Sequence, residues 1–185
     1  MSDLELKPTR IAEVVEICPR IIEDSRGFFM ESWNSRCFAR EGIDASFVQD
    51  NHSRSQQGIL RGLHYQIRRE QGKLVRVVRG EVFDVAVDLR RSSASFGQWV
   101  GVYLSEDRHN MLWVPPGFAH GFYVTSHTAD LLYKCTDFYS PDYDRTLRWD
   151  DPQLAIDWPL VSGEVPTVSD KDAAGVGLAD AETFA

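Results

Sequence analysis

Short apolar runs separated by turn residues follow one another along almost the whole chain. In the run at 81–89, Phe83, Val85 and Val87 point one way and Asp84 and Asp88 the other. This alternation is the period-two pattern of a half-buried strand. Further strands are predicted over residues 11–18, 27–32, 47–52, 58–66, 73–79, 98–104, 111–114, 119–125 and 129–138.

One segment favours a helix. Residues 34–41 carry Asn34 as an N-cap and are followed by Gly42, which ends the helix.

Strands about 8–12 residues apart, with little helix, predict an all-β sandwich or barrel. A jelly roll of two packed sheets is the closed form expected at this length. No linker or repeat divides the chain, so one domain is predicted over 1–185, with the segment from about residue 150 wrapping the barrel.

Composition limits the cellular setting. The 185 residues contain no apolar run near the length of a membrane span, and the N-terminus lacks the pattern of a secretory signal. The three cysteines, Cys18, Cys37 and Cys135, form no CxxC pair. A disulfide scaffold is therefore not expected, and a cytoplasmic location is predicted.

Charge is distributed unevenly. Residues 137–185 hold 11 acids and 3 bases, whereas residues 1–136 hold 17 of each. The acidic C-terminal quarter argues against nucleic-acid binding. Residues 54–79 nevertheless carry seven Arg and Lys against one acid. Such a segment suits a small anionic ligand, or it is a solvated basic face, and charge alone does not separate the two.

Two histidines have informative neighbours. His120 follows Pro115-Pro116-Gly117 in a spacing like the second half of the cupin signature. Metal-binding cupins supply a His-x-His pair in the first half, but here Gln66 stands two residues after His64. A metal site needs three or more well-placed ligands, so a metal is not favoured.

His64 could instead be a structural side chain or a general base. A base needs a carboxylate to orient the ring, and Asp170 and Asp172 are both candidates. Tyr133 is a packed aromatic residue or an acid. Strict alternation places Arg61 and His64 on opposite faces of their strand, so a bulge at Gly62 is hypothesised that turns both toward one cavity.

Many motifs in fixed order resemble the dTDP-4-dehydrorhamnose 3,5-epimerase family, a group of metal-free cupins. The resemblance spans about residues 10–175. The matching stretches are 24–32, 47–53, 58–66, 71–76, 80–88, 115–122, 133–134 and 169–172.

The resemblance implies a role for individual residues. His64 corresponds to the catalytic base, Asp172 to its carboxylate partner and Tyr133 to the general acid. Lys73 corresponds to the cation beside the keto oxygen of the substrate. The implied nucleotide-sugar contacts, with Asp144 standing where a Glu is usual, are Arg26, Glu31, Gln49, Asp50, Asn51, Arg61, His120, Asp144 and Lys171.

The implied activity is an isomerase reaction in dTDP-L-rhamnose biosynthesis. It would invert carbons 3 and 5 of dTDP-4-dehydro-6-deoxy-D-glucose without a cofactor or metal. The resemblance also implies a homodimer in which N-terminal strands join the partner's sheet. A single-carbon epimerase for an antibiotic sugar, a metal-dependent cupin oxygenase and a non-catalytic sugar-nucleotide binding module are the alternatives.

Overall fold

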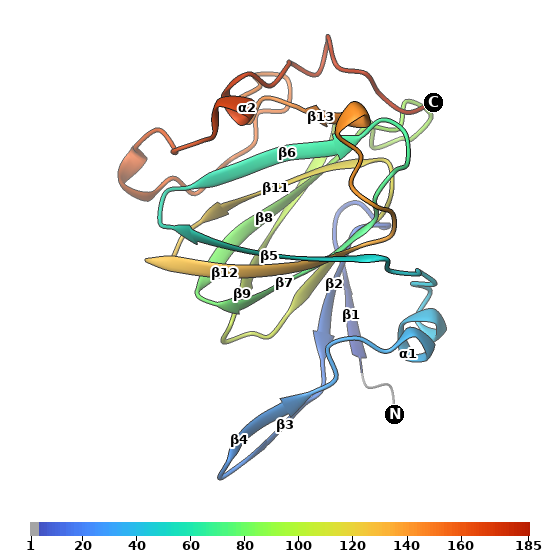
Figure 1. Ribbon diagram of the computed structural model, residues 1–185, viewed down its shortest axis with the longest axis vertical. Coiled ribbons are helices and arrows are strands. Elements are labelled where there is room, and N and C mark those ends of the chain that lie inside the picture. Colours follow the sequence, from blue (N-terminus) through green and yellow to red (C-terminus); the bar gives the residue numbers. More distant parts are fainter. Residues whose placement is uncertain (1–3) are drawn as a thin grey trace.

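Two antiparallel sheets face each other in the computed structural model, which describes residues 4–185 (Figure 1). The larger sheet contains, in spatial order, β1 (Leu4–Pro8), β2 (Val15–Pro19), β10 (Met111–Val114), β7 (Lys73–Arg79), β12 (Thr128–Cys135) and β5 (Gln49–Gln56). The smaller sheet contains β13 (Asp144–Thr146), β6 (Leu60–Gln66), β11 (Phe118–Val124), β8 (Glu81–Asp88) and β9 (Trp99–Ser105). The predicted all-β jelly roll of cupin type is confirmed.

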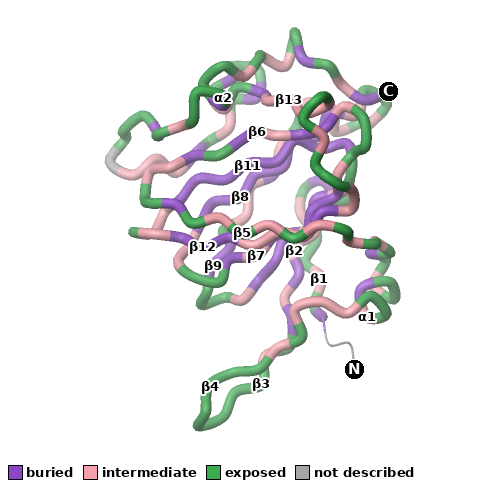
Figure 2. Tube along the Cα trace, viewed as in Figure 1, coloured by how far each residue is buried: buried purple, intermediate pink, exposed green. Residues whose placement is uncertain are grey.

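The elements outside these sheets are short. A hairpin of β3 (Ile21–Asp24) and β4 (Gly27–Met30) extends away from the body of the protein and is largely exposed (Figure 2). Asn34 caps the predicted helix, α1 (Ser35–Arg40), because its side chain accepts hydrogen bonds from the N–H groups of Arg36 and Cys37. The remaining helices are η1 (Pro141–Tyr143), η2 (Val161–Gly163) and α2 (Asp170–Ala173).

Apolar side chains from both sheets fill the space between them. Val75, Val77 and Leu131 from the larger sheet pack against Val82 and Ala86 from the smaller one, and all five are buried. Successive residues of a strand point to opposite faces, so each of these strands also has an outward face.

The outward face of β8 corrects one prediction. The strand was expected to be half-buried, but both of its faces are buried. Leu154, Trp158 and Phe184, from the segment after residue 150, pack in the same cluster as Phe83 and Val85 on the outer face of the smaller sheet. Burying each such side chain stabilises the fold by about 1.5–3 kcal/mol, so this segment is part of the core.

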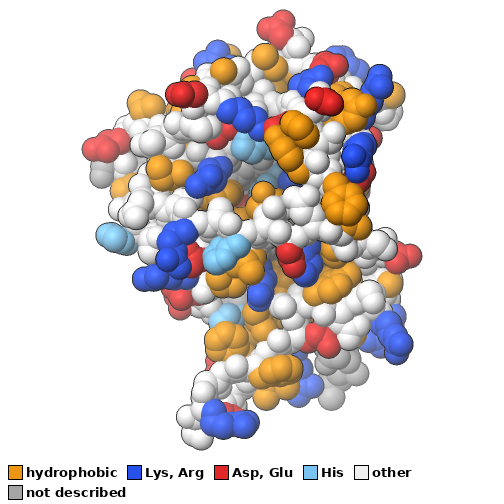
Figure 3. Space-filling model, in the orientation of Figure 1, with side chains coloured by type: hydrophobic (Ala, Val, Ile, Leu, Met, Phe, Trp, Pro, Cys, Tyr) orange, Lys and Arg blue, Asp and Glu red, His pale blue; other side chains and the backbone are white. Residues whose placement is uncertain are grey.

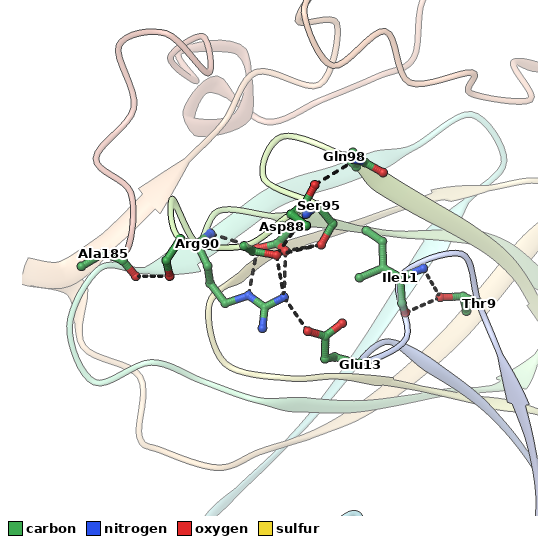
Figure 4. A network of polar contacts seen from close by, with 11 residues as sticks. Thr9, Ile11, Glu13, Asp88, Arg90, Ser95, Gln98 and Ala185 are labelled. Atoms are coloured by element: carbon green, nitrogen blue, oxygen red, sulfur yellow. Dashed lines mark hydrogen bonds and ion pairs between the residues drawn. The ribbon is translucent and has the colours of Figure 1, made fainter.

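A polar network ties the C-terminus to the body of the protein (Figure 4). Asp88 accepts hydrogen bonds from Arg90 (2.7 Å) and Ser95 (2.7 Å), and Arg90 also contacts Glu13. Burial alone would raise the pKa of Asp88, but these hydrogen bonds outweigh it and lower the pKa to about 2. Ser92 donates to the backbone oxygen of Ala185, the last residue of the chain.

Candidate active site

A cavity of about 170 Å³ lies between the two sheets and is bounded on one side by the loops around β13 and α2. Figure 3 shows the front of the molecule hollowed there, with histidine side chains visible inside the recess. Seven of the predicted site residues line this cavity: Arg61, His64, Lys73, His120, Tyr133, Asp144 and Lys171.

His64 forms a pair with Asp172 on the wall made by the smaller sheet. Its Nε2 lies 2.5 Å from Asp172 Oδ1, while the backbone N–H of Gly62 donates to the other carboxylate oxygen (3.4 Å). Asp172 is only 3% exposed, and Ser169 caps the helix that carries it. Burial acts to raise the pKa of Asp172, but the His64 hydrogen bond helps lower it overall, so the carboxylate stays ionised. Asp170 is exposed, so Asp172 is the partner.

The bulge hypothesis at Gly62 is confirmed. His64 pairs with His120 and Arg61 pairs with Phe122, so three steps along β6 oppose two along β11. Gly62 has a φ of +115°, and a Cβ there would lie 2.6 Å from the Cα of Gly121. The extra residue changes the alternation of β6, and both Arg61 and His64 line the cavity.

A second histidine–carboxylate pair lies beside the first. His120 Nε2 lies 2.9 Å and 3.0 Å from the two oxygens of Asp84, and both residues are buried. Burial is the main influence on Asp84 and raises its pKa, although His120 and Lys73 oppose it. Asp84 therefore fixes the orientation of the His120 ring toward the cavity.

The opposite wall belongs to the larger sheet. Lys73 on β7 is 6% exposed, and burial lowers the pKa of its ammonium group, opposed by Cys135, Asp144 and Asp84. Within residues 4–185, the ammonium forms no hydrogen bond or ion pair. Tyr133 on β12 faces the same cavity, and burial raises the pKa of its phenol. A buried cation and a half-buried phenol thus face the two histidines across the cavity.

Polar side chains surround the cavity mouth. Asp144 Oδ2 accepts hydrogen bonds from the Tyr139 hydroxyl (3.0 Å) and from the Lys171 ammonium group. Gln49 accepts from the backbone N–H of Tyr139 (2.9 Å) and donates to Asn51, which lies opposite Tyr133 in the sheet. Arg61 donates to Ser55 (2.9 Å) through Nε, and its outer nitrogens have no hydrogen bond to the residues that the structure describes.

Three predicted contacts lie elsewhere in this chain. Arg26 is at the tip of the β3–β4 hairpin, where its side chain is 87% exposed and pairs with Asp24. Glu31 is exposed and follows the same hairpin. Asp50 points to the outer face of the larger sheet and pairs with Lys134 (2.7 Å). Their roles in binding stay predictions.

The sequence reasoning missed three residues near the site. Asp84 was assigned to a solvent-facing side of its strand, although an acid inside an apolar run is itself a sign of a buried, paired carboxylate. Gln66 donates to backbone oxygens of Arg69 (2.7 Å) and Phe138 (3.3 Å), so it holds the adjacent loops together. Tyr139 carried no signal in the sequence, because its position depends on the fold of the loop after β12.

No metal-binding cluster is present among the described residues. In the same part of the chain, no helix is both long and apolar enough to cross a bilayer.

Known proteins have similar sequences over most of the chain. A family model described as dTDP-4-dehydrorhamnose 3,5-epimerase matches residues 8–180. A Pseudomonas aeruginosa protein named dTDP-4-dehydrorhamnose 3,5-epimerase is 56% identical, over 97% of this chain and 99% of that protein. An Escherichia coli protein of the same name is 52% identical, over 88% of this chain and 89% of its own length.

Solved structures are similar over nearly the whole chain. A Legionella pneumophila 3,5-epimerase in complex with dTDP-4-keto-L-rhamnose has a TM-score of 0.93 and 53% identity, covering 97% of this chain and 95% of that one. A 3'-monoepimerase from Streptomyces bikiniensis in complex with dTDP-quinovose has a TM-score of 0.85 and 32% identity, covering 93% of this chain and 87% of that one.

Proposed function

Because the chain belongs to the dTDP-4-dehydrorhamnose 3,5-epimerase family, and is therefore an isomerase, we propose that it inverts carbons 3 and 5 of dTDP-4-dehydro-6-deoxy-D-glucose. The product is dTDP-4-dehydro-L-rhamnose. The observation that carries this proposal is the cavity itself, in which an imidazole–carboxylate pair and a phenol face each other from different sheets.

His64 acts as the base that removes the proton next to the ketone. Its Nε2–H donates to Asp172, which leaves Nδ1 as the nitrogen that accepts a proton. The ionised Asp172 then stabilises the imidazolium that forms. This arrangement supports proton transfer, whereas a module that only binds a sugar nucleotide has no use for a base held by a buried carboxylate.

Tyr133 returns a proton from the opposite side of the sugar ring. Inversion needs removal on one face and delivery on the other, so the two groups must flank the ring. His64 comes from β6 of the smaller sheet and Tyr133 from β12 of the larger one. Burial keeps the phenol protonated because it raises the pKa of Tyr133.

Lys73 stabilises the negative charge that develops on the keto oxygen. A proton next to a ketone is far less acidic than an imidazolium, so the enolate must be stabilised as it forms. The Lys73 ammonium is already desolvated and has no hydrogen bond or ion pair among the described residues, so it is available to the substrate oxygen. His120, held by Asp84, supplies a second polar contact to the sugar.

The nucleotide diphosphate lies at the cavity mouth. Arg61 and Lys171 are the cations that line this part of the cavity, and guanidinium groups suit phosphate oxygens. Gln49 and Asn51 lie next to the mouth on β5 and extend the binding surface.

A homodimer completes this binding surface. β5 is an edge strand of the larger sheet, and the exposed β3–β4 hairpin carries Phe28 and Phe29 at its surface. Pairing of this hairpin with the β5 edge of a second copy would cover both and bring Arg26 and Glu31 toward the partner's Gln49 position. Sedimentation equilibrium tests the dimer. A monomer that retains full activity would contradict this part of the proposal.

Sequence identity favours double over single epimerisation. The named 3,5-epimerases among the curated relatives are 42–56% identical to this chain, whereas the structures of the 3'-monoepimerase are 31–32% identical. Single epimerisation differs only in how the ring is presented to the base and acid, so it remains the second candidate.

Proton NMR of the substrate in D₂O tests the proposal. The wild-type protein, treated with a chelator, should bring deuterium into carbons 3 and 5, and His64→Ala should abolish this. His127→Ala, which removes an exposed histidine, is the matched control and should retain full exchange. Exchange at one carbon alone would indicate the single-carbon epimerase. Absence of exchange at both would refute the chemistry.

A further inference from the structure

We propose that His109 is a positioning residue that holds the β3–β4 hairpin in the direction in which it meets a second copy of the chain. This inference rests on the homodimer in the proposed function and identifies the contact that prepares it. The rings of His109 and Phe28 lie 4.3 Å apart between centroids, at an interplanar angle of 39°. His109 belongs to the turn between β9 and β10, whereas Phe28 belongs to the hairpin.

The hairpin has little else that fixes its direction. Within residues 4–185, β3 and β4 pair with each other and with no strand of either sheet. Residues 22–29 are exposed, and the hairpin extends away from the body of the protein (Figure 1). Because an isolated two-stranded hairpin is at best marginally stable in water, a contact with the body is needed to give it one orientation.

The two faces of the hairpin have different surroundings. Phe28 lies opposite Glu23 and directs its ring to His109, whereas Phe29 lies opposite Ile22 and points to the other face. The side chains of Phe29 and Ile22 are highly exposed, at 68% and 53%. One face of the hairpin therefore rests on the body, and the other presents an apolar pair that a second copy would cover.

The turn that carries His109 is firmly attached. Asn110 is 1% exposed, and its side chain donates to Glu16 of β2 (2.6 Å) and to the backbone oxygen of Tyr103 (2.9 Å). The backbone N–H of His109 donates to the oxygen of Ser105 (3.1 Å). Because β2 leads into the hairpin, the base of the hairpin and the turn that contacts Phe28 are fixed to the same strand.

The backbone of His109 also indicates a specific role. Its φ of +51° lies in the left-handed region, which is uncommon for residues other than glycine. Glycine would adopt this conformation more readily but has no ring. Within the described residues the His109 ring forms no hydrogen bond or ion pair, and it contacts the Phe28 ring. The contact with Phe28 therefore explains a histidine at this position.

Replacement of His109 by asparagine tests the contact and spares the turn, because asparagine also tolerates the left-handed region. Loss of a ring pair changes an equilibrium by about two- to twelvefold. A symmetric dimer has two hairpins, so the dissociation constant of the dimer should rise by about 4- to 150-fold. At protein concentrations well above that constant, kcat should change less than about twofold. His127→Asn, at an exposed histidine, is the matched control and should change neither.

A double-mutant cycle ties the effect to Phe28. Phe28→Leu should weaken the dimer as His109→Asn does, whereas Phe28→Tyr keeps the ring and should not. The two changes together should add less than about twofold to either one alone, because both remove the same contact. Phe29→Leu acts on the opposite face, so its effect should multiply with that of His109→Asn. Sedimentation equilibrium over a range of concentrations gives these constants, and urea unfolding checks that each variant is folded.

Three results would overturn the proposal. Absence of a nuclear Overhauser effect between the ring protons of His109 and Phe28 in the wild type would refute the contact. An unchanged dimer in His109→Asn, or effects of His109→Asn and Phe28→Leu that multiply, would show that the hairpin does not depend on His109. A monomeric wild type would refute the homodimer and this proposal with it, while deuterium exchange would still report the proposed chemistry separately.

Discussion

Replacing Lys73 by methionine should make the protein more stable and much slower. Lys73 is almost wholly buried, and in the described part of the chain its ammonium group has no hydrogen bond or ion pair. A buried charge without such a partner destabilises the folded state, while the aliphatic stem packs as a methionine would. The charge at this position is therefore explained by catalysis and not by stability.

The magnitude follows from the burial. An unsatisfied buried polar group costs about 1–3 kcal/mol, and the Lys73 ammonium group lines the cavity, so the variant should gain about 1 kcal/mol of free energy of unfolding, the low end of that range. For a chain of this size, about 2–4 °C accompanies each kcal/mol, which corresponds to a rise in Tm of roughly 2–4 °C. Loss of a donor to a developing oxyanion typically lowers kcat by about 10²–10³-fold, and a similar loss is expected here.

The stability difference should also depend on pH. The pKa of Lys73 is lower in the folded protein than its ordinary value of 10.5, because burial disfavours the charged form. At pH values between the folded pKa and 10.5, the unfolded chain binds more protons than the folded protein. The free energy of unfolding of the wild type therefore rises with pH in this range. The advantage of Lys73→Met is therefore largest below the folded pKa and shrinks as the pH approaches 10.5.

Urea unfolding from pH 7 upward and deuterium exchange at saturating substrate measure the two effects. Arg108→Met, at an exposed position outside the site, is the control and should change neither. A Lys73→Met protein that is less stable than wild type, or that retains its rate, would refute the reasoning, because the ammonium group would then have a structural role.

The remaining predictions concern the bulge, the acid and the buried carboxylate near the C-terminus. Gly62→Ala should lower the free energy of unfolding by more than about 2 kcal/mol in urea titrations, because its Cβ would lie 2.6 Å from Gly121. Gly42→Ala has a positive φ but no atom within 4 Å, so about 1 kcal/mol is expected. Tyr133→Phe should retain deuterium exchange by NMR but lose inversion by about 10²–10⁴-fold. Asp88→Asn should destabilise the protein by about 2 kcal/mol at pH 7, and calorimetry should find this difference lost as the pH falls from 3.8 through about 2.

Local sequence patterns predicted much of the fold. The strands at 73–79 and 111–114 were predicted to the residue, because apolar and β-branched residues there end at clear turn signals. β1 was missed because Leu4–Pro8 contains only two apolar residues before its proline, and pairing with β2 supplies what the sequence pattern lacks. β3 was missed because most of its residues are exposed, so no buried face imposes alternation.

The site was less accessible to such patterns. The family resemblance implied His64, Lys73, Tyr133 and Asp172 as site residues, but the contact between His64 and Asp172 joins residues 108 positions apart. Periodicity cannot reveal which carboxylate of the C-terminal segment reaches the ring. Alternation along β8 placed Asp84 on the solvent side of the strand. Residues 150–185 pack on the opposite face of β8, and such a tertiary contact cannot be predicted from local alternation.

The position of Asp172 after the strands of both sheets also has a consequence for biosynthesis. Chains emerge from the ribosome N-terminus first, and both sheets are complete in sequence by Thr146. Until residues 147–185 follow, the outer faces of β8 and β11 expose side chains such as Phe83 and Val85 to solvent. A nascent chain at this stage has a histidine without its carboxylate and an uncovered apolar sheet. Slow synthesis of residues 147–185 would therefore delay activity and leave a surface that favours aggregation or chaperone binding.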